Sequence, residues 1–175
     1  SLSGLKSILF PLLRGKDMVK GISGPGISTY KEVMSHGSSF KLADLDPTDV
    51  AALQFTGGTT GLPKAATLTH ENIYINCQQA GRWFPGIQDG QEKILTVLPL
   101  FHVFAMTICM NYMAMRGGEM VMQPNFDKDN AAKAIGAGAT IFAGVPAMFN
   151  ALANHPDIKS GKIKLDALKY CVSGG

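Results

Sequence analysis

The chain has 175 residues, of which 46% are hydrophobic and 17% charged, so it is globular rather than disordered. Its formal net charge of +3 is too small to argue for a nucleic-acid partner or an anionic membrane surface. The three cysteines (Cys77, Cys109 and Cys171) are widely spaced, which fits free thiols in a reducing cytosol rather than a disulfide framework or a metal cluster.

Residues 1–49 are expected to form an N-terminal helix and connecting loops. A short helix is predicted over residues 5–20. Residues 21–29 hold three glycines and a proline, which is typical of a loop. A second short helix is predicted over residues 30–36.

From residue 50 onward, predicted strands and helices alternate. Strands are predicted over residues 50–55, 93–98, 119–123, 139–144 and 168–173. Helices are predicted over residues 70–84, 102–115, 128–137 and 147–154. This order predicts an α/β fold with a largely parallel sheet flanked by helices.

Local signals support several of these helices. Thr69 and Asp127 are the predicted N-caps of the helices that follow them. Pro146 suits the first turn of a helix. The segment 102–115 is apolar nearly all round, which predicts a buried helix, and Gly117 should help to end it.

Residues 56–64 carry the most informative pattern of the chain, Thr-Gly-Gly-Thr-Thr-Gly-Leu-Pro-Lys, directly after a predicted strand. Glycines allow a sharp turn whose N–H groups form an anion-binding nest. Threonine hydroxyls and the Lys64 ammonium add donors and charge, so the segment suits a polyphosphate. It is not the common phosphate loop, in which Gly and Lys are adjacent and Ser or Thr follows. A plain Gly/Thr turn is the alternative.

Ligands of parallel sheets bind beyond the carboxyl ends of the strands. The Gly/Thr loop, His102, residues 144–146 and residues 173–175 all follow predicted strands. We therefore expect these four segments to meet at one edge of the sheet.

Three segments, in order, resemble motifs of the adenylate-forming (AMP-binding) superfamily. They are residues 56–64 with the Leu-Thr-His-Glu-Asn that follows at 68–72, Leu-Pro-Leu-Phe-His-Val-Phe-Ala at 98–105, and Ser-Gly-Gly at 173–175. Leu-Gln-Phe at 53–55 and Gly-Val-Pro at 144–146 fit the long-chain fatty acyl-CoA synthetase branch. The resemblance implies an incomplete portion of the N-terminal domain of such an enzyme, with residues 50–175 as a partial AMP-binding subdomain truncated at its C-terminal end.

The resemblance implies ATP-dependent activation of a long-chain fatty acid to acyl-AMP, followed by thioester formation with coenzyme A. Mg²⁺ would arrive with ATP, and no metal ligand can be assigned. The implied location is cytoplasmic; peripheral association with the inner face of a membrane and the oligomeric state are left open. The family's metal-ligand glutamate, ribose-binding aspartate and catalytic lysine would lie beyond Gly175, so these 175 residues alone are expected to be inactive.

The resemblance also implies roles for individual residues. His102 and Lys64 are the expected catalytic residues. Nucleotide binding is expected at Thr56, Gly57, Gly58, Thr59, Thr60, Gly61, Lys64, Gly174 and Gly175. The acyl substrate is expected to contact His102, Met106, Val145 and Pro146. One departure is Ala65, where the family usually has glycine.

The residues themselves leave alternatives open. His102 could be a packed histidine at a helix start, and Lys64 a solvated lysine. Five apolar residues could line a hydrocarbon tunnel or pack in the core: Phe101, Phe104, Met106, Met110 and Met113. His36 and His155 are expected at the surface.

Three other functions remain open at this stage. One is another adenylating ligase, acting on an aryl, short-chain or amino acid. Another is a non-catalytic module that binds a nucleotide or an acyl partner. A phosphate-loop kinase is disfavoured by the missing Gly-Lys pair.

Overall fold

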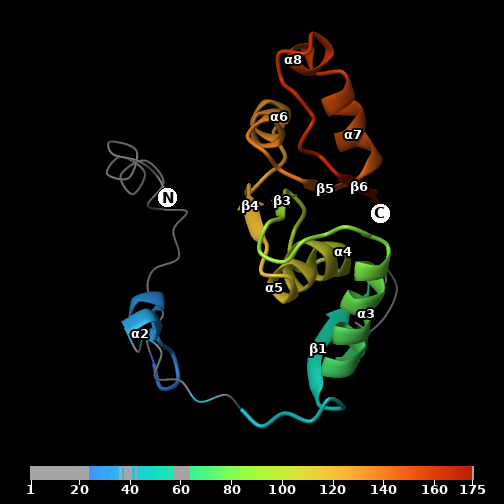
Figure 1. Cartoon of the computed structure of the whole chain (residues 1–175). Coiled ribbons are helices and arrows are strands. Elements are labelled where there is room, and N and C mark those ends of the chain that lie inside the picture. The colour runs from blue at the N-terminus through green and yellow to red at the C-terminus, as the bar shows by residue number, and fades with distance from the viewer. Residues whose placement is uncertain (1–23, 36, 38–40, 42, 57–63, 175) are drawn as a thin grey trace. The chain divides into compact units, whose positions relative to one another are not determined.

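The structure is a computed structural model that describes residues 24–35, 37, 41, 43–56 and 64–174. Contacts divide the chain into two compact units, Ser1–Asp44 and Leu45–Gly175. In the first unit, helix α2 spans Tyr30–Ser35 (Figure 1). Thr29 caps it: the Glu32 carboxylate accepts from the Thr29 backbone N–H at 2.6 Å, and Thr29 Oγ1 accepts from the Glu32 N–H at 3.2 Å. The predicted boundary after residue 49 stays a prediction.

The second unit contains a parallel four-stranded sheet with the strand order β4-β3-β5-β6. Its strands are β3 (Lys93–Thr96), β4 (Glu119–Met122), β5 (Ile141–Gly144) and β6 (Tyr170–Ser173). All three pairings are parallel. The predicted α/β fold with a parallel sheet flanked by helices is thereby confirmed.

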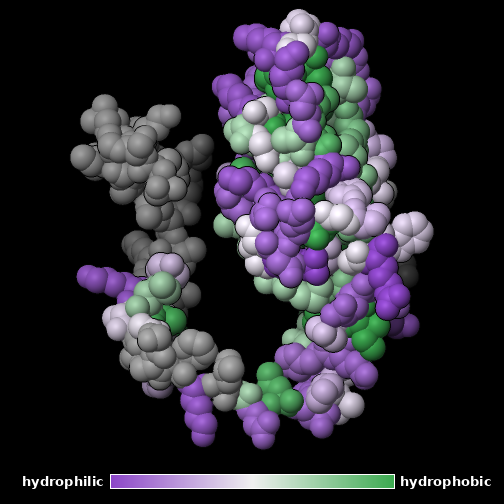
Figure 2. Space-filling model, viewed as in Figure 1, coloured by the Kyte–Doolittle hydropathy of each residue, from purple (hydrophilic) through white to green (hydrophobic). Residues whose placement is uncertain are grey.

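Helices connect these strands and cover both faces of the sheet (Figure 1). Between β3 and β4 the chain forms α4 (Val103–Ala105), the π-helical segment η1 (Met106–Asn111) and α5 (Tyr112–Met115). Helix α6 (Lys128–Gly136) joins β4 to β5, and α7 (Pro146–Ala153) and α8 (Pro156–Lys159) precede β6. Polar residues cover the outward sides of α6 and α8 (Figure 2).

The core forms on both faces of the sheet. On β3, Ile94 belongs to the cluster beneath α4–α5, whereas Leu95 belongs to the cluster beneath α6 and α7. On β5, Ile141 belongs to the cluster beneath α4–α5 and Phe142 to the cluster beneath α6 and α7. Burial on both faces explains why these strands are continuously apolar in sequence.

Strands β1 (Val50–Phe55) and β2 (Ala65–Thr69) form a separate antiparallel hairpin. Two expectations were wrong here. The sequence interpretation missed β2, and β1 is not a strand of the parallel sheet. The physical reason is that the chain reverses between residues 56 and 64, so that the ladder partner of β1 is the segment directly after the loop.

Helix α3 (His70–Arg82) follows β2 without a break. Thr69 caps it as predicted: its hydroxyl accepts from the Asn72 N–H at 3.2 Å, and the Asn72 side chain accepts from the Thr69 N–H at 3.1 Å. Cys77 is buried on one face of α3, and Ala80 is partly buried.

The predicted helix 102–115 exists as α4, η1 and α5, but it is not buried all round. Ala105, Cys109, Tyr112 and Met113 are buried, whereas Val103 and Met115 are exposed. The helix is apolar all round yet packs only one side onto the sheet. Gly117, with φ of +64°, follows its C-cap as expected. No helix in the described ranges is long and apolar enough to cross a membrane.

His155 corrects another expectation, because it is buried rather than at the surface. Its Nδ1 accepts from the Asp157 N–H at 3.2 Å and caps α8. Its Nε2 lies 2.9 Å from Asp129 Oδ1 on α6. Since Nδ1 is an acceptor, Nε2 carries the proton and donates to the carboxylate.

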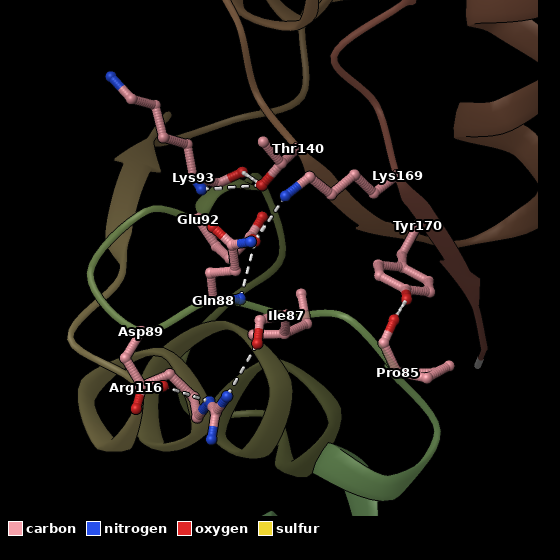
Figure 3. Close-up of polar contacts among 10 residues, drawn as sticks. All are labelled: Pro85, Ile87, Gln88, Asp89, Glu92, Lys93, Arg116, Thr140, Lys169 and Tyr170. Carbon is pink, nitrogen blue, oxygen red and sulfur yellow. Dashed lines mark hydrogen bonds and ion pairs between the residues drawn. The ribbon is translucent and has the colours of Figure 1, made fainter.

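Polar contacts link the segments that precede β3 and β6 at the amino edge of the sheet (Figure 3). Glu92, 1% exposed, lies just before β3, and its Oε1 accepts from Lys169 Nζ at 2.7 Å and from the Gln88 N–H at 3.1 Å. The Tyr170 hydroxyl donates to the Pro85 carbonyl. These contacts tie the start of β6 to the segment that leads into β3.

Candidate active site

The strand order creates a crevice at the carboxyl edge of the sheet. The chain leaves β3 toward β4 on one side and leaves β5 toward β6 on the other. The carboxyl ends of β3 and β5 are therefore a topological switch point, where open α/β sheets bind ligands. The segments that carry His102 and Val145 begin here.

His102 is exposed and caps helix α4. Its Nδ1 accepts from the Phe104 N–H at 3.3 Å, and its carbonyl accepts from the Met106 N–H at 2.9 Å. The bond to Nδ1 puts the proton of a neutral ring on Nε2. His102 is exposed and can therefore donate from Nε2 to a bound acceptor.

The carboxyl ends of β5 and β6 meet beside α4. The Gly174 N–H donates to the Gly144 carbonyl at 3.2 Å. A Cβ atom on Gly174 would lie 3.5 Å from the Phe104 ring. Val145 is the N-cap of α7 and Pro146 its first residue. The structure thus brings Gly174 and the segment after His102 together, while Gly175 lies outside the described residues.

The two ends of the Gly/Thr loop meet at the tip of the hairpin. The Thr56 N–H donates to the Lys64 carbonyl at 2.9 Å, and the Thr56 hydroxyl lies 3.3 Å from the same oxygen. Both residues are exposed. Gly57, Gly58, Thr59, Thr60 and Gly61 lie outside the described residues. The reason for expecting this loop at the sheet edge was wrong, because β1 is not a strand of the parallel sheet. The convergence itself stays a prediction.

A groove runs between α3 and the helix that follows His102. It contains two cavities of about 640 and 410 Å³ that share Asn76, Gln79, Val103 and Thr107. Phe104 and Val172 line the larger cavity, and Met106 lines the smaller. Because Phe104 also faces Gly174, the larger cavity lies next to the carboxyl edge. Val145 and Pro146 line neither of these two cavities.

Sequence reasoning missed the α3 side of this groove. Asn72, Asn76, Gln79 and Trp83 recur at spacings of 4, 3 and 4, one residue before the apolar stripe that packs in the core. This helical spacing was the sequence signal that could have identified these residues as one face of α3. It gives the groove a wall of amides opposite the apolar side chains of Val103 and Met106.

The electrostatics of the groove are neutral, because the residues that line the two cavities are all uncharged. Burial raises the pKa of the nearby Cys109 thiol to about 11, so it is a packing residue rather than a nucleophile. Among the residues that the structure describes, there is no group of three or more His, Cys, Asp or Glu side chains that could hold a metal ion. Within the described part of the chain, no ion pair involves Lys64.

Comparisons with known proteins agree with this geometry. The model of a family described as AMP-binding enzyme matches residues 15–175. A long-chain-fatty-acid–CoA ligase of Bacillus subtilis is 35% identical over 174 residues, which is 97% of this chain and 31% of that relative. A feruloyl-CoA synthase of an Amycolatopsis species is 34% identical over 128 residues, covering 73% of this chain and 25% of the relative.

Solved structures show the same relationship. ATP-bound MatB from Rhodopseudomonas palustris superimposes with a TM-score of 0.68 at 26% identity, covering 78% of this chain and 26% of that chain. The chain therefore spans about a third or less of the length of the proteins that it matches.

Proposed function

Because the chain belongs to the AMP-binding enzyme family, we propose that it is part of a cytoplasmic, ATP- and CoA-dependent ligase that activates a long-chain fatty acid. The observation that carries this proposal is the uncharged groove beside the carboxyl edge of the sheet, which suits an acyl chain. The similarity to a long-chain-fatty-acid–CoA ligase over 97% of the chain supports it.

The Gly/Thr loop is proposed to hold the phosphates of ATP. Thr56, Thr59 and Thr60 would donate hydroxyl hydrogen bonds, and the backbone at Gly57, Gly58 and Gly61 would approach the phosphate oxygens. Lys64 is exposed at the end of the hairpin, so its ammonium can reach an anion. Mg²⁺ bound to the phosphates would offset their negative charge. Gly174 and Gly175 would lie against the adenine, where a bulky side chain would collide.

In the first step, a carboxylate oxygen attacks the α-phosphorus of ATP, and pyrophosphate leaves with the bonding electrons. The main demand on the protein is to hold the two groups in line. We assign to His102 Nε2–H the role of donating to an oxygen of the reacting carboxylate or α-phosphate. In the second step, the thiol of coenzyme A attacks the acyl carbonyl, and AMP leaves.

The acyl group is proposed to enter the groove from the carboxyl edge. Phe104 and Ile108 would contact the part nearest to the carboxylate, because they line the larger cavity. Met106 lines the smaller cavity, and its flexible side chain suits an alkyl chain. Val145 and Pro146 are proposed to contact the acyl group at the mouth.

An aromatic acid is the second candidate substrate. The amide wall formed by Asn76 and Gln79 favours a substrate with hydroxyl or methoxyl substituents, because these exposed amide groups can donate to and accept from such oxygens. One relative is named a feruloyl-CoA synthase.

ATP–pyrophosphate exchange by the full-length gene product tests the proposal. A panel of saturated fatty acids, hydroxycinnamic acids and amino acids would be compared in the wild type, Thr59→Ala and Lys64→Ala. Lys162→Ala is the matched control, because Lys162 pairs with Asp157 on the surface. Exchange that depends on a long fatty acid and falls only in the loop variants supports the proposal. Preference for hydroxycinnamic acids supports the second candidate, and no exchange with any acid contradicts both.

A further inference from the structure

The β1–β2 hairpin has an outer face of apolar and small side chains. On this face Leu53 lies opposite Thr67, and Phe55 lies opposite Ala65. All four residues are exposed, Leu53 by 59% and Phe55 by 64%. Side chains directly opposite each other in an antiparallel pair lie in contact, so these four form one continuous surface, which we call the outer face.

The opposite face of the hairpin is turned toward α3. On that face Ala52, Gln54 and Leu68 are partly buried, whereas Ala66 is exposed. Leu68 lines the smaller cavity together with Asn72 and Ile73 of α3. Helix α3 therefore packs beside one face of the hairpin, and the outer face lies on the opposite side of the two strands.

The outer face lacks the features that protect a solvent-exposed strand. A sheet face that stays in water usually carries polar side chains, but neither β1 nor β2 contains a charged residue or a proline. Apart from Gln54 on the α3-facing side, the residues of β1 are apolar on both faces, as in strands that are covered on both sides. A hairpin of two strands also needs a third strand or a second packing layer for independent stability.

We infer that the outer face packs against polypeptide of the same enzyme that lies outside these 175 residues. The argument for this occupant is length, since the chain covers only 31% of the Bacillus subtilis relative and 26% of MatB. The occupant presents an apolar surface to Leu53 and Phe55. This contact would fix the hairpin whose tip carries the Gly/Thr loop.

Cysteine labelling tests this inference without reference to activity. Leu53→Cys and Phe55→Cys would each be introduced into the 175-residue chain and into the full-length gene product, with all other exposed cysteines, Cys171 included, replaced by serine. The buried Cys77 reports in both proteins that the fold is intact. We expect rapid maleimide labelling at both positions in the short chain and labelling slower by about tenfold or more in the full-length protein.

Equal labelling rates in the two proteins would overturn the inference. Slow labelling already in the short chain would also overturn it. If that slow labelling depends on protein concentration, a second copy covers the face; if it does not, other residues of the short chain cover it. Because labelling does not depend on turnover, this result is independent of the adenylation assay.

Discussion

Replacing Lys169 by methionine removes the charged partner of a buried carboxylate. Glu92 is 1% exposed, and Lys169 Nζ lies 2.7 Å from its Oε1. Within the described part of the chain, Glu92 Oε2 is buried with no hydrogen-bond partner. In Lys169→Met the Gln88 N–H would be the remaining hydrogen-bond donor to Oε1, so the buried carboxylate would keep one neutral hydrogen bond but lose its counter-charge.

The expected loss of stability follows from this geometry. Removing one partner of a fully buried ion pair costs about 3–5 kcal/mol. The Lys169 side chain is 44% exposed, so water screens part of the interaction, and we expect about 2 kcal/mol. Urea unfolding should show a fall of about 1 M in the midpoint, for a typical slope of about 2 kcal/mol per molar urea.

Two further variants make this a double-mutant cycle. Glu92→Gln removes the charge but keeps an oxygen for Lys169 and Gln88, so it should cost less than Lys169→Met. In the double variant no buried charge remains, and its loss should be smaller than the sum of the two single losses by about 1 kcal/mol or more.

The matched control is Lys93→Met. Lys93 is 45% exposed and lies 2.9 Å from Glu119, which is itself 58% exposed. Exposed pairs contribute little, so this variant should lose less than about 0.5 kcal/mol. Equal losses in Lys93→Met and Lys169→Met, or strictly additive effects in the cycle, would refute the reasoning.

Further predictions concern pH, caps and close packing. Burial alone would raise the pKa of Glu92, but Lys169, the neighbouring Thr140 hydroxyl and the Gln88 N–H lower it overall. The resulting stability is present above the ordinary glutamate pKa and is lost as pH falls through the lowered value, so the unfolding midpoint of Glu92→Gln should depend less on pH below about 4.5. Thr69→Ala should cost about 1 kcal/mol by thermal unfolding, because it removes the α3 cap, whereas Thr67→Ala on the exposed strand face should cost less. Gly118→Ala would force a Cβ against the Met113 methyl and to 3.1 Å from the Glu92 carbonyl, costing about 1–3 kcal/mol in the same assay. Gly174→Ala meets the Phe104 ring at 3.5 Å, an ordinary contact, and should leave the melting temperature unchanged.

The parallel sheet was predictable because its two central strands, β3 and β5, are short apolar runs buried on both faces. Ile94 and Leu95, neighbours in sequence, enter opposite cores, which is why β3 has no polar alternation. The carboxyl-edge positions of His102 and Pro146 followed from the end of each strand, and Pro146 begins α7 as expected.

The hairpin was not predictable by the same reasoning. Ala65-Ala66-Thr67-Leu68-Thr69 has neither the length nor the alternation of a clear strand. Its pairing with β1 is made across the Gly/Thr loop, and a loop sequence of this kind does not show whether the chain reverses or crosses over. Only the antiparallel pairing of β1 with β2 in the structure shows that Thr56 and Lys64 lie at the tip of a hairpin.

The site was partly predictable. The motif residues were identified from sequence, but the groove beside them depends on how α3 packs against the helix after His102. Gln79 and Trp83 are separated from Thr107 by more than twenty residues of sequence, so only the packing shows that they share a cavity. The burial of His155 likewise depends on Asp129, which is on a different helix.

The central claim is that the full-length enzyme transfers AMP to a carboxylate. The most direct measurement is to incubate it with [α-³²P]ATP and a long-chain fatty acid without coenzyme A, and then to add coenzyme A. We predict an acid-dependent, labelled acyl-adenylate that disappears on addition of the thiol, with its label recovered as AMP. Label appearing in ADP, or no labelled product that depends on the acid, would contradict the account.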